Sequence, residues 1–174
     1  QTRLRLSHIS TLALLLISFS LDPFKPTLQV PNSSGLNPLL QTDLMVIHPP
    51  LIFLTYALCF QLTSIGLSSA YLNSNEKIQQ RTLAVARPAL IIATIGIGLG
   101  GLWAYLILDW GGYWAWDPVE TGSILPWFAL LLIIHARSTS NVSKSIKISP
   151  ALGLISGLLA IHATLVTRAN GVWA

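Results

Sequence analysis

Apolar residues along the chain form five long runs, and short polar segments separate them. A membrane-spanning helix needs about 20 mostly apolar residues, and each run has roughly this length or more. The expected spans are residues 4–21, 44–72, 85–108, 118–136 and 146–167. No stretch remains for a soluble domain, so the pattern predicts an all-α polytopic membrane helix bundle with one domain, residues 1–174. Glycines in the third run predict close helix packing there: Gly96, Gly98, Gly100 and Gly101.

The composition supports a membrane protein and excludes two other classes. Hydrophobic residues make up 52% of the chain and charged residues only 9%, with a mean hydropathy of +0.64. A soluble domain carries about 25% charged residues, and disordered chains are polar, so both classes are excluded. The single cysteine, Cys59, excludes an intrachain disulfide, and the chain has no C-x-x-C-H motif for covalent haem attachment.

Basic residues gather on alternate connecting segments, which predicts the orientation in the membrane. Lys25 and Arg168 share their side with five of the six acidic residues. The other eight basic residues lie on the opposite side: Arg3, Arg5, Lys77, Arg81, Arg87, Arg137, Lys144 and Lys147. The positive-inside rule therefore places segments 22–43 and 109–117 and the C-terminus outside. Because the basic residues are distributed according to membrane side, the net charge of +4 does not indicate nucleic-acid binding.

The outer segment 109–120, D-W-G-G-Y-W-A-W-D-P-V-E, is the most informative part of the chain and holds three of the six tryptophans. Tryptophan and tyrosine also settle at membrane interfaces, so an aromatic belt is one interpretation. The other is a ligand platform. Gly111 and Gly112 permit a turn or a close backbone approach, and Trp114 and Trp116 share a face if the segment is extended. A flat aromatic surface suits a porphyrin, and the residues alone leave both interpretations open.

Two acids in this segment have a sufficient structural role at the start of the fourth span. Asp117 is placed to cap the helix, and Pro118 suits its first position. Glu120, three residues after the cap, completes a capping box. This role does not exclude a ligand role for Asp117.

Two of the four histidines are candidate ligands. His48 opens the second span, on the same outer side as the aromatic segment, although a polar residue at the interface is the alternative. His135 closes the fourth span, about 26 Å from the aromatic segment at 1.5 Å per residue, so one porphyrin cannot reach both. An ionisable residue in a span is a candidate functional residue, and a neutral histidine bonded to a neighbouring helix is the alternative. Imidazole is a common ligand of haem iron.

The aromatic segment resembles the tryptophan-rich WWD signature of a superfamily of haem-handling proteins. Within it the chain is most similar to the CcmF family, the haem lyase component of system I cytochrome c maturation. The H-P-P-L motif at 48–51, A-R-P at 86–88 and P-W at 126–127 support the resemblance. T-L-V-T-R at 164–168 resembles the family's G-T-F-x-x-R region, so the similarity covers most of residues 20–174.

The resemblance implies two haems at opposite ends of the bundle. It implies that His48 ligates the iron of an external haem in transit and that His135 ligates a membrane-embedded haem b. His8 and His162 match no family ligand and are expected to be structural. The residues that match the cradle of the external haem are Trp110, Gly111, Gly112, Trp114, Trp116 and Asp117.

Full family members are several times longer and supply a second external and a second membrane histidine. We therefore expect the N-terminal-central portion of a split CcmF, a subunit of a multi-chain haem lyase that is not self-sufficient as an enzyme. The implied partners are the remaining CcmF portion or portions, the haem chaperone CcmE, a CcmH-type apocytochrome-binding protein and apocytochrome c. The implied location is the mitochondrial inner membrane, or alternatively a prokaryotic cell membrane, with the WWD segment facing the intermembrane space or periplasm.

Two other function classes stay open. One is a structural scaffold subunit that has lost haem, since a single chain of this length lacks the partner histidines. The other is a transporter of haem or a small solute. Two features argue against a transporter: the spans carry few polar residues, and the sequence has no inverted repeat.

Overall fold

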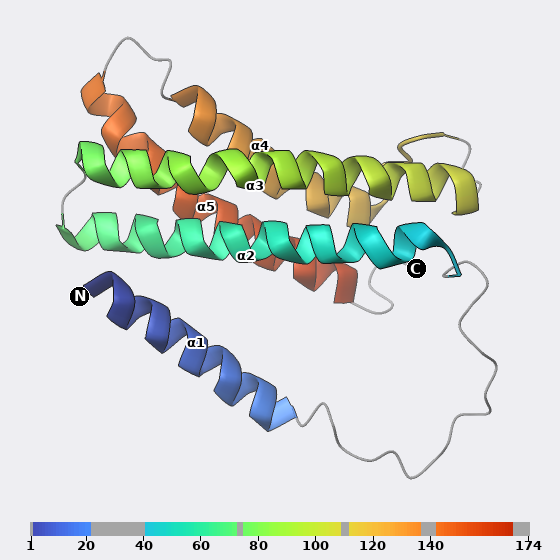
Figure 1. The fold of residues 1–174 in the computed structure, drawn as a ribbon, viewed down its shortest axis with the longest axis horizontal. Coiled ribbons are helices and arrows are strands. Elements are labelled where there is room, and N and C mark those ends of the chain that lie inside the picture. Colours follow the sequence, from blue (N-terminus) through green and yellow to red (C-terminus); the bar gives the residue numbers. More distant parts are fainter. Residues whose placement is uncertain (1, 22–40, 73–74, 109–111, 137–141, 169–174) are drawn as a thin grey trace. The chain divides into compact units, whose positions relative to one another are not determined.

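The computed structural model describes residues 2–21, 41–72, 75–108, 112–136 and 142–168 (Figure 1). It divides the chain into two compact units, Gln1–Gln41 and Thr42–Ala174. The grouping of all 174 residues into one membrane domain stays a prediction. Among the described residues there is no β-strand, which agrees with the predicted all-α fold.

In the first unit the described residues include the helix α1 (Thr2–Leu21). Its apolar part, Thr11–Ser20, is shorter than a membrane span because polar residues occupy the first half of the helix. Within the described residues, four helices are long and apolar enough to cross a membrane. The predicted polytopic helical class is confirmed with four spans where five were expected, and the role of α1 as a span stays a prediction.

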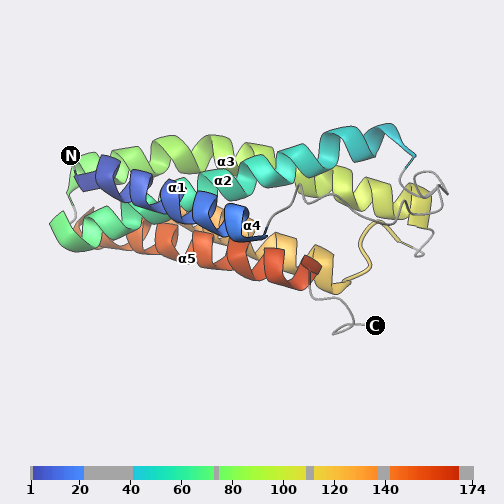
Figure 2. The ribbon, with the colours of Figure 1, turned by 90° about the horizontal axis from the view of Figure 1, so that it is seen from below.

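The second unit is a bundle of α2 (Asp43–Leu72), α3 (Glu76–Trp103), α4 (Pro118–His135) and α5 (Val142–Arg168). A π-helical turn, η2 (Ala104–Leu108), continues α3. Helices α2 and α3 run side by side in opposite directions, and α5 packs against α2, α3 and α4 (Figures 1 and 2). This arrangement brings the start of α2, the end of α3, the start of α4 and the end of α5 to one end of the bundle.

Helix α3 begins nine residues before the expected start of the third span at residue 85. The Asn75 side chain caps it by accepting a hydrogen bond from the backbone N–H of Ile78 at 3.0 Å. The added turns are amphipathic, because Ile78, Thr82 and Leu83 are buried while the charged side chains beside them are exposed. The apolar run therefore marks only the membrane part of the helix, and the cap marks its true start.

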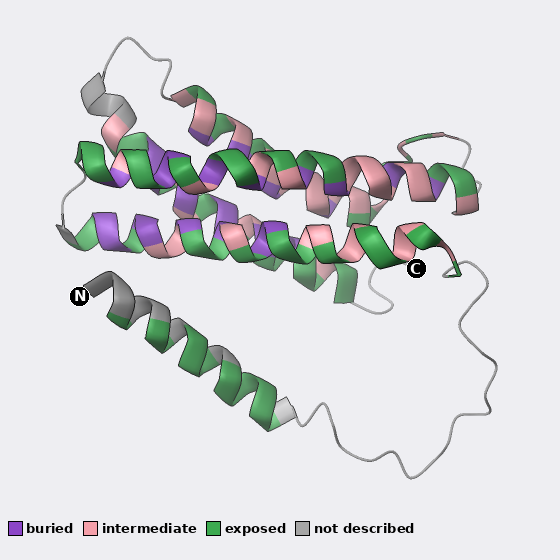
Figure 3. Ribbon diagram, in the orientation of Figure 1, coloured by how far each residue is buried: buried purple, intermediate pink, exposed green. Residues whose placement is uncertain are grey.

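The interior of the bundle is small, and large apolar side chains cover the outside. Leu62, Leu130 and Ile133 are fully buried, and Figure 3 shows buried positions on the inward sides of the helices. Phe53 and Leu158 are 60% and 64% exposed. Lipid tails solvate such side chains, so an apolar exterior is the expected surface of a membrane bundle.

Glycines bring α2 and α5 into close contact. An added Cβ at Gly66 would lie 2.5 Å from the carbonyl oxygen of Pro150. An added Cβ at Gly153 would lie 2.9 Å from the carbonyl oxygen of Leu62. Small residues allow two helix backbones to approach in this way. The sequence predicted such packing on α3, and the structure has it there at Gly96, where an added Cβ would lie 3.1 Å from Cδ1 of Ile52 and 3.3 Å from Cβ of Leu51 in α2. The α2–α5 contact is a second close approach that was not predicted.

Candidate functional site

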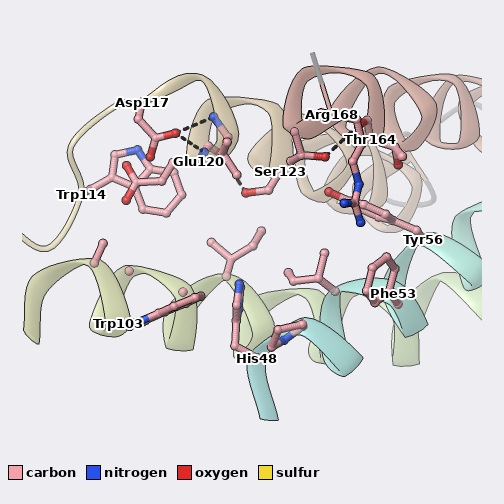
Figure 4. A pocket seen from close by; sticks show the side chains of 18 residues that line it. His48, Phe53, Tyr56, Trp103, Trp114, Asp117, Glu120, Ser123, Thr164 and Arg168 are labelled. Carbon is pink, nitrogen blue, oxygen red and sulfur yellow. Dashed lines mark hydrogen bonds between the residues drawn. The ribbon is translucent and has the colours of Figure 1, made fainter. Parts of the chain in front are cut away.

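A cavity of about 390 Å³ opens where the four helices of the second unit meet at one end (Figure 4). Its volume lies in the range of small-molecule sites. His48 and Trp103 lie on one side of it, and Trp114, Asp117 and Glu120 lie across from them. The structure thus brings together the first histidine candidate and part of the aromatic segment, which the sequence placed 66 residues apart.

A backbone hydrogen bond fixes the His48 ring. Its Nδ1 lies 2.8 Å from the carbonyl oxygen of Gly96. Because a carbonyl only accepts, Nδ1 carries the proton, and the neutral ring then has its lone pair on Nε2. Metal-ligating histidines are commonly oriented by such a bond from the other ring nitrogen. The Trp103 ring packs edge-on against the imidazole, with centroids 6.0 Å apart.

The glycines of α3 provide space for side chains of this site. An added Cβ at Gly100 would lie 2.7 Å from Cε1 and 3.3 Å from Nε2 of His48. At Gly101 it would lie 2.8 Å from Cε1 of Tyr113, whose hydroxyl donates a hydrogen bond to the carbonyl of Gly98. The imidazole and the phenol therefore rest directly on the α3 backbone.

The aromatic segment does not form the expected flat surface. The rings of Trp114 and Trp116 have centroids 6.1 Å apart but are inclined by 79°. Trp116 has a φ of 58°, so the backbone is left-handed there rather than extended. Trp114 lines the cavity, whereas Trp116 is 70% exposed and does not. The expectation that both rings share one face is therefore wrong.

The glycines of this segment are only partly described. Trp110 and Gly111 lie outside the described residues. At Gly112 the nearest atom to an added Cβ is the carbonyl oxygen of Trp114, at 3.9 Å. Space alone therefore does not require a glycine at position 112.

Asp117 caps α4 as expected. Its Oδ1 accepts hydrogen bonds from the backbone N–H groups of Val119 at 2.5 Å and Glu120 at 3.2 Å, and Pro118 occupies the first turn. Glu120 Oε2 accepts instead from the N–H of Ala115, at 2.8 Å. The acid thus ties the aromatic segment to the helix, rather than closing a capping box on Asp117 itself.

Two buried polar atoms at the cavity have no hydrogen-bond partner in the described part of the chain. They are Nε1 of Trp114 and Oε1 of Glu120. A buried polar group without a partner costs about 1–3 kcal/mol, and such groups in native proteins require an explanation, such as a ligand or an ordered water. Their presence on cavity-lining residues fits a site for a partly polar ligand.

Helix α5 contributes a polar wall that the sequence analysis did not assign to the site. Thr164, Thr167 and Arg168 line the cavity. Tyr56 of α2 also lines it, and the Arg168 side chain points toward Tyr56 in Figure 4. The available signal was Arg168 itself, one of two basic residues on the predicted acidic side of the membrane.

The other two histidines of the second unit do not line the cavity. His135 is exposed at the end of α4, and His162 is exposed on α5. His8 is exposed on α1 of the first unit. No group of three or more His, Cys, Asp or Glu side chains suited to hold a metal ion is found in the described ranges. The structure therefore separates His48 from His135, and their ligand roles stay predictions.

Comparisons with known proteins agree on one family. The family model described as "Cytochrome C assembly protein" matches residues 1–167. The chain is 36% identical over 165 residues to the cytochrome c-type biogenesis protein CcmF of Escherichia coli, covering 90% of this chain and 25% of that protein. It is 34% identical to the cytochrome c-type biogenesis protein ccl1 of Rhodobacter capsulatus, covering 77% of this chain and 21% of that protein.

A third relative is the probable cytochrome c-type biogenesis protein NrfE of Escherichia coli, 33% identical over 93% of this chain and 30% of that protein. The chain spans about a quarter of the length of these relatives. No solved structure matches it. The family match extends over nearly the whole chain, and the chain belongs to the cytochrome C assembly protein family.

Proposed function

We propose that this membrane protein acts in cytochrome c maturation, as the subunit of a system I haem lyase that receives external haem as a substrate in its cavity. One observation carries the proposal. His48 stands at the wall of a ligand-sized cavity with Nδ1 bonded to the Gly96 carbonyl, which leaves Nε2 as the ligating nitrogen. A haem iron takes its equatorial ligands from the porphyrin, so one or two side chains suffice to hold it.

The cavity walls support a flat, largely apolar ligand with polar edges. Trp103 and Trp114 line the cavity on opposite sides, and Ile52, Phe53 and Ile97 add apolar surface. Binding sites of this kind are mostly apolar, with a few polar groups that fix orientation. In this proposal Trp114 contacts the ring of the substrate, whereas Trp116, which is 70% exposed, faces a partner protein.

The proposal gives His135 a separate role as ligand of a membrane-embedded haem b. Phe128, Leu132 and His135 follow one another at spacings of four and three along α4, and all are exposed, so they share one face. A second membrane helix that carries a histidine can cover this face and complete the site. When bound, a haem b supplies electron transfer, here to keep the delivered haem iron reduced.

The chain works with the remaining CcmF portion or portions, and with CcmE and a CcmH-type protein that present haem and apocytochrome c. Its aromatic segment faces the intermembrane space of a mitochondrion or the periplasm. The chain itself binds and orients, and no described residue has the environment of a conventional nucleophile.

The experiment is to purify the native complex and record visible and pyridine-haemochrome spectra for the wild type, His48→Ala and His135→Ala. His162→Ala is the matched control, since His162 is exposed on α5 and does not line the cavity. We expect His48→Ala to lose chaperone-delivered haem and keep the b-type signal, and His135→Ala to lose the b-type signal. No haem in an intact wild-type complex would overturn the proposal and leave a scaffold role.

A further inference from the structure

Arg168 is a cation without a described role at the cavity. It is the last residue of α5, and its side chain extends from that helix toward Tyr56 (Figure 4). In the described part of the chain its guanidinium has no ion pair or hydrogen bond. The acids of the cavity bond to backbone groups: Asp117 accepts from two backbone N–H groups, and Glu120 accepts from that of Ala115 through Oε2 only.

Arg168 and His48 lie at different ends of the cavity. Tyr56, toward which the Arg168 side chain points in Figure 4, is eight residues after His48 in α2. Eight residues of helix correspond to about 12 Å along its axis. The wall between them is apolar and includes Ile52 and Phe53. The cavity therefore offers a metal-ligating nitrogen at one end and a positive charge at the other.

We infer that Arg168 binds a carboxylate of the tetrapyrrole substrate and so sets its orientation in the cavity. The inference rests on the proposed function, in which His48 ligates the iron. A haem carries its iron at the centre and both carboxylates on one edge, which is the pattern that the cavity presents. Arginine suits this task, because its planar fork donates two parallel hydrogen bonds to a carboxylate.

The same contact resolves a cost of placing haem beside a membrane. A carboxylate removed from water is strongly destabilised unless it is paired and hydrogen-bonded. Arg168 provides both the charge and the N–H donors, since the hydroxyls of Thr164 and Thr167 on the same wall donate to the backbone carbonyls of Ala160 and Thr164. With its carboxylate edge held at α5, the substrate directs its opposite, vinyl-bearing edge away from α5.

The test measures binding of haem and of haem dimethyl ester to the intact complex in a non-ionic detergent free of anionic lipid. The ester lacks the carboxylate charge. We expect Arg168→Gln to weaken haem binding about 10- to 100-fold and to leave ester binding unchanged. Arg168→Lys keeps the charge without the fork and is expected to give an intermediate loss. Arg87→Gln is the matched control, because Arg87 is exposed on α3 and does not line the cavity.

The outcomes distinguish carboxylate binding by Arg168 from a lipid contact and from failure of the proposed function. Equal loss of haem and ester in Arg168→Gln, or no loss of either, would overturn the inference. An effect that appears only after anionic lipid is added would also overturn it, and would assign Arg168 to a lipid phosphate. A wild type that binds neither compound at His48 would instead refute the proposed function. A retained b-type signal in the variants shows that the complex is folded.

Discussion

Two glycine-containing regions of the bundle look alike in the sequence but have different structural roles. Between α2 and α5, atoms of the opposite helix crowd the sites where a Cβ would lie at Gly66 and Gly153. On α3, the crowding atoms at Gly100 and Gly101 belong to His48 and Tyr113. The first region holds two helices together, and the second makes room for the side chains of the candidate site.

The neighbour of a glycine therefore determines whether its replacement disturbs a helix contact or a side chain of the site. A displaced backbone moves a whole helix, because packed interiors do not yield locally. A displaced side chain can leave the helices in place and still lose its function. Substitutions in the two regions should therefore separate stability from binding.

The largest expected effect on stability is at the α2–α5 contact. Gly66→Ala places a methyl group 2.5 Å from the Pro150 carbonyl oxygen and 2.7 Å from Cγ of Leu154. Overpacking of this kind costs about 1–3 kcal/mol, and alanine's higher helix propensity offsets only part of it. Thermal unfolding followed by circular dichroism in detergent measures the loss. Gly122→Ala in α4 is the control, since its nearest contact is an ordinary 3.5 Å, and equal stability of the two variants would contradict the prediction.

The next effect falls on binding rather than stability. Gly100→Ala forces the His48 ring away from its seat and from the Gly96 carbonyl. We expect haem binding at His48 to fall about tenfold or more, which corresponds to about 1.4 kcal/mol, with an unchanged unfolding temperature. Gly98→Ala is the control. Gly98 lies two residues before Gly100 in the same helix, and an added Cβ there would meet only the Tyr113 hydroxyl, at 3.6 Å. If both variants bind haem equally, the Gly100 seat has no role.

The two regions also show how far the sequence alone could lead. The start of α4 was predicted to the residue, because Asp117 and Pro118 combine a cap with a suitable first position. The start of α3 was missed, because hydropathy marks the membrane part and not the capped amphipathic turns after Asn75. Local chemistry of the chain is sufficient for such ends when the cap signal is used.

The candidate site was predicted only in part, for a physical reason. His48 and Trp114 carry recognisable chemistry, and the structure places both at one cavity. The seat on Gly100 and the position of Arg168 depend on which helices become neighbours, which no local pattern encodes. The prediction that Trp114 and Trp116 share a face failed because it requires an extended backbone, and the backbone at Trp116 is left-handed.

A smaller effect on stability is expected at Trp116, whose backbone is in the left-handed conformation. A non-glycine residue in this conformation destabilises the folded state by about 1–2 kcal/mol. Glycine avoids that strain, but its greater conformational freedom in the unfolded chain offsets part of the gain in stability. We expect Trp116→Gly to be about 0.5–1 kcal/mol more stable than Trp116→Ala, by thermal unfolding of the complex. Both variants lack the indole, so they should have equal haem affinity. A difference in affinity would show that the backbone, rather than the ring, positions the site.

The smallest effect tests whether a hydrogen bond adds to the glycine contact between α2 and α5. The Thr63 hydroxyl lies 3.0 Å from the Cys59 carbonyl of its own helix and 3.3 Å from the Gly153 carbonyl of α5. Thr63→Val keeps the shape and removes the donor, and hydrogen bonds between membrane helices contribute about 0.6 kcal/mol on average. We expect Thr63→Val to lose stability by about that amount. Ser64→Ala is the control and is expected to change little, because the Ser64 hydroxyl bonds only to the Phe60 carbonyl within α2. A loss several times larger would mean that the hydroxyl, and not the close approach of the backbones at Gly153, holds the two helices together.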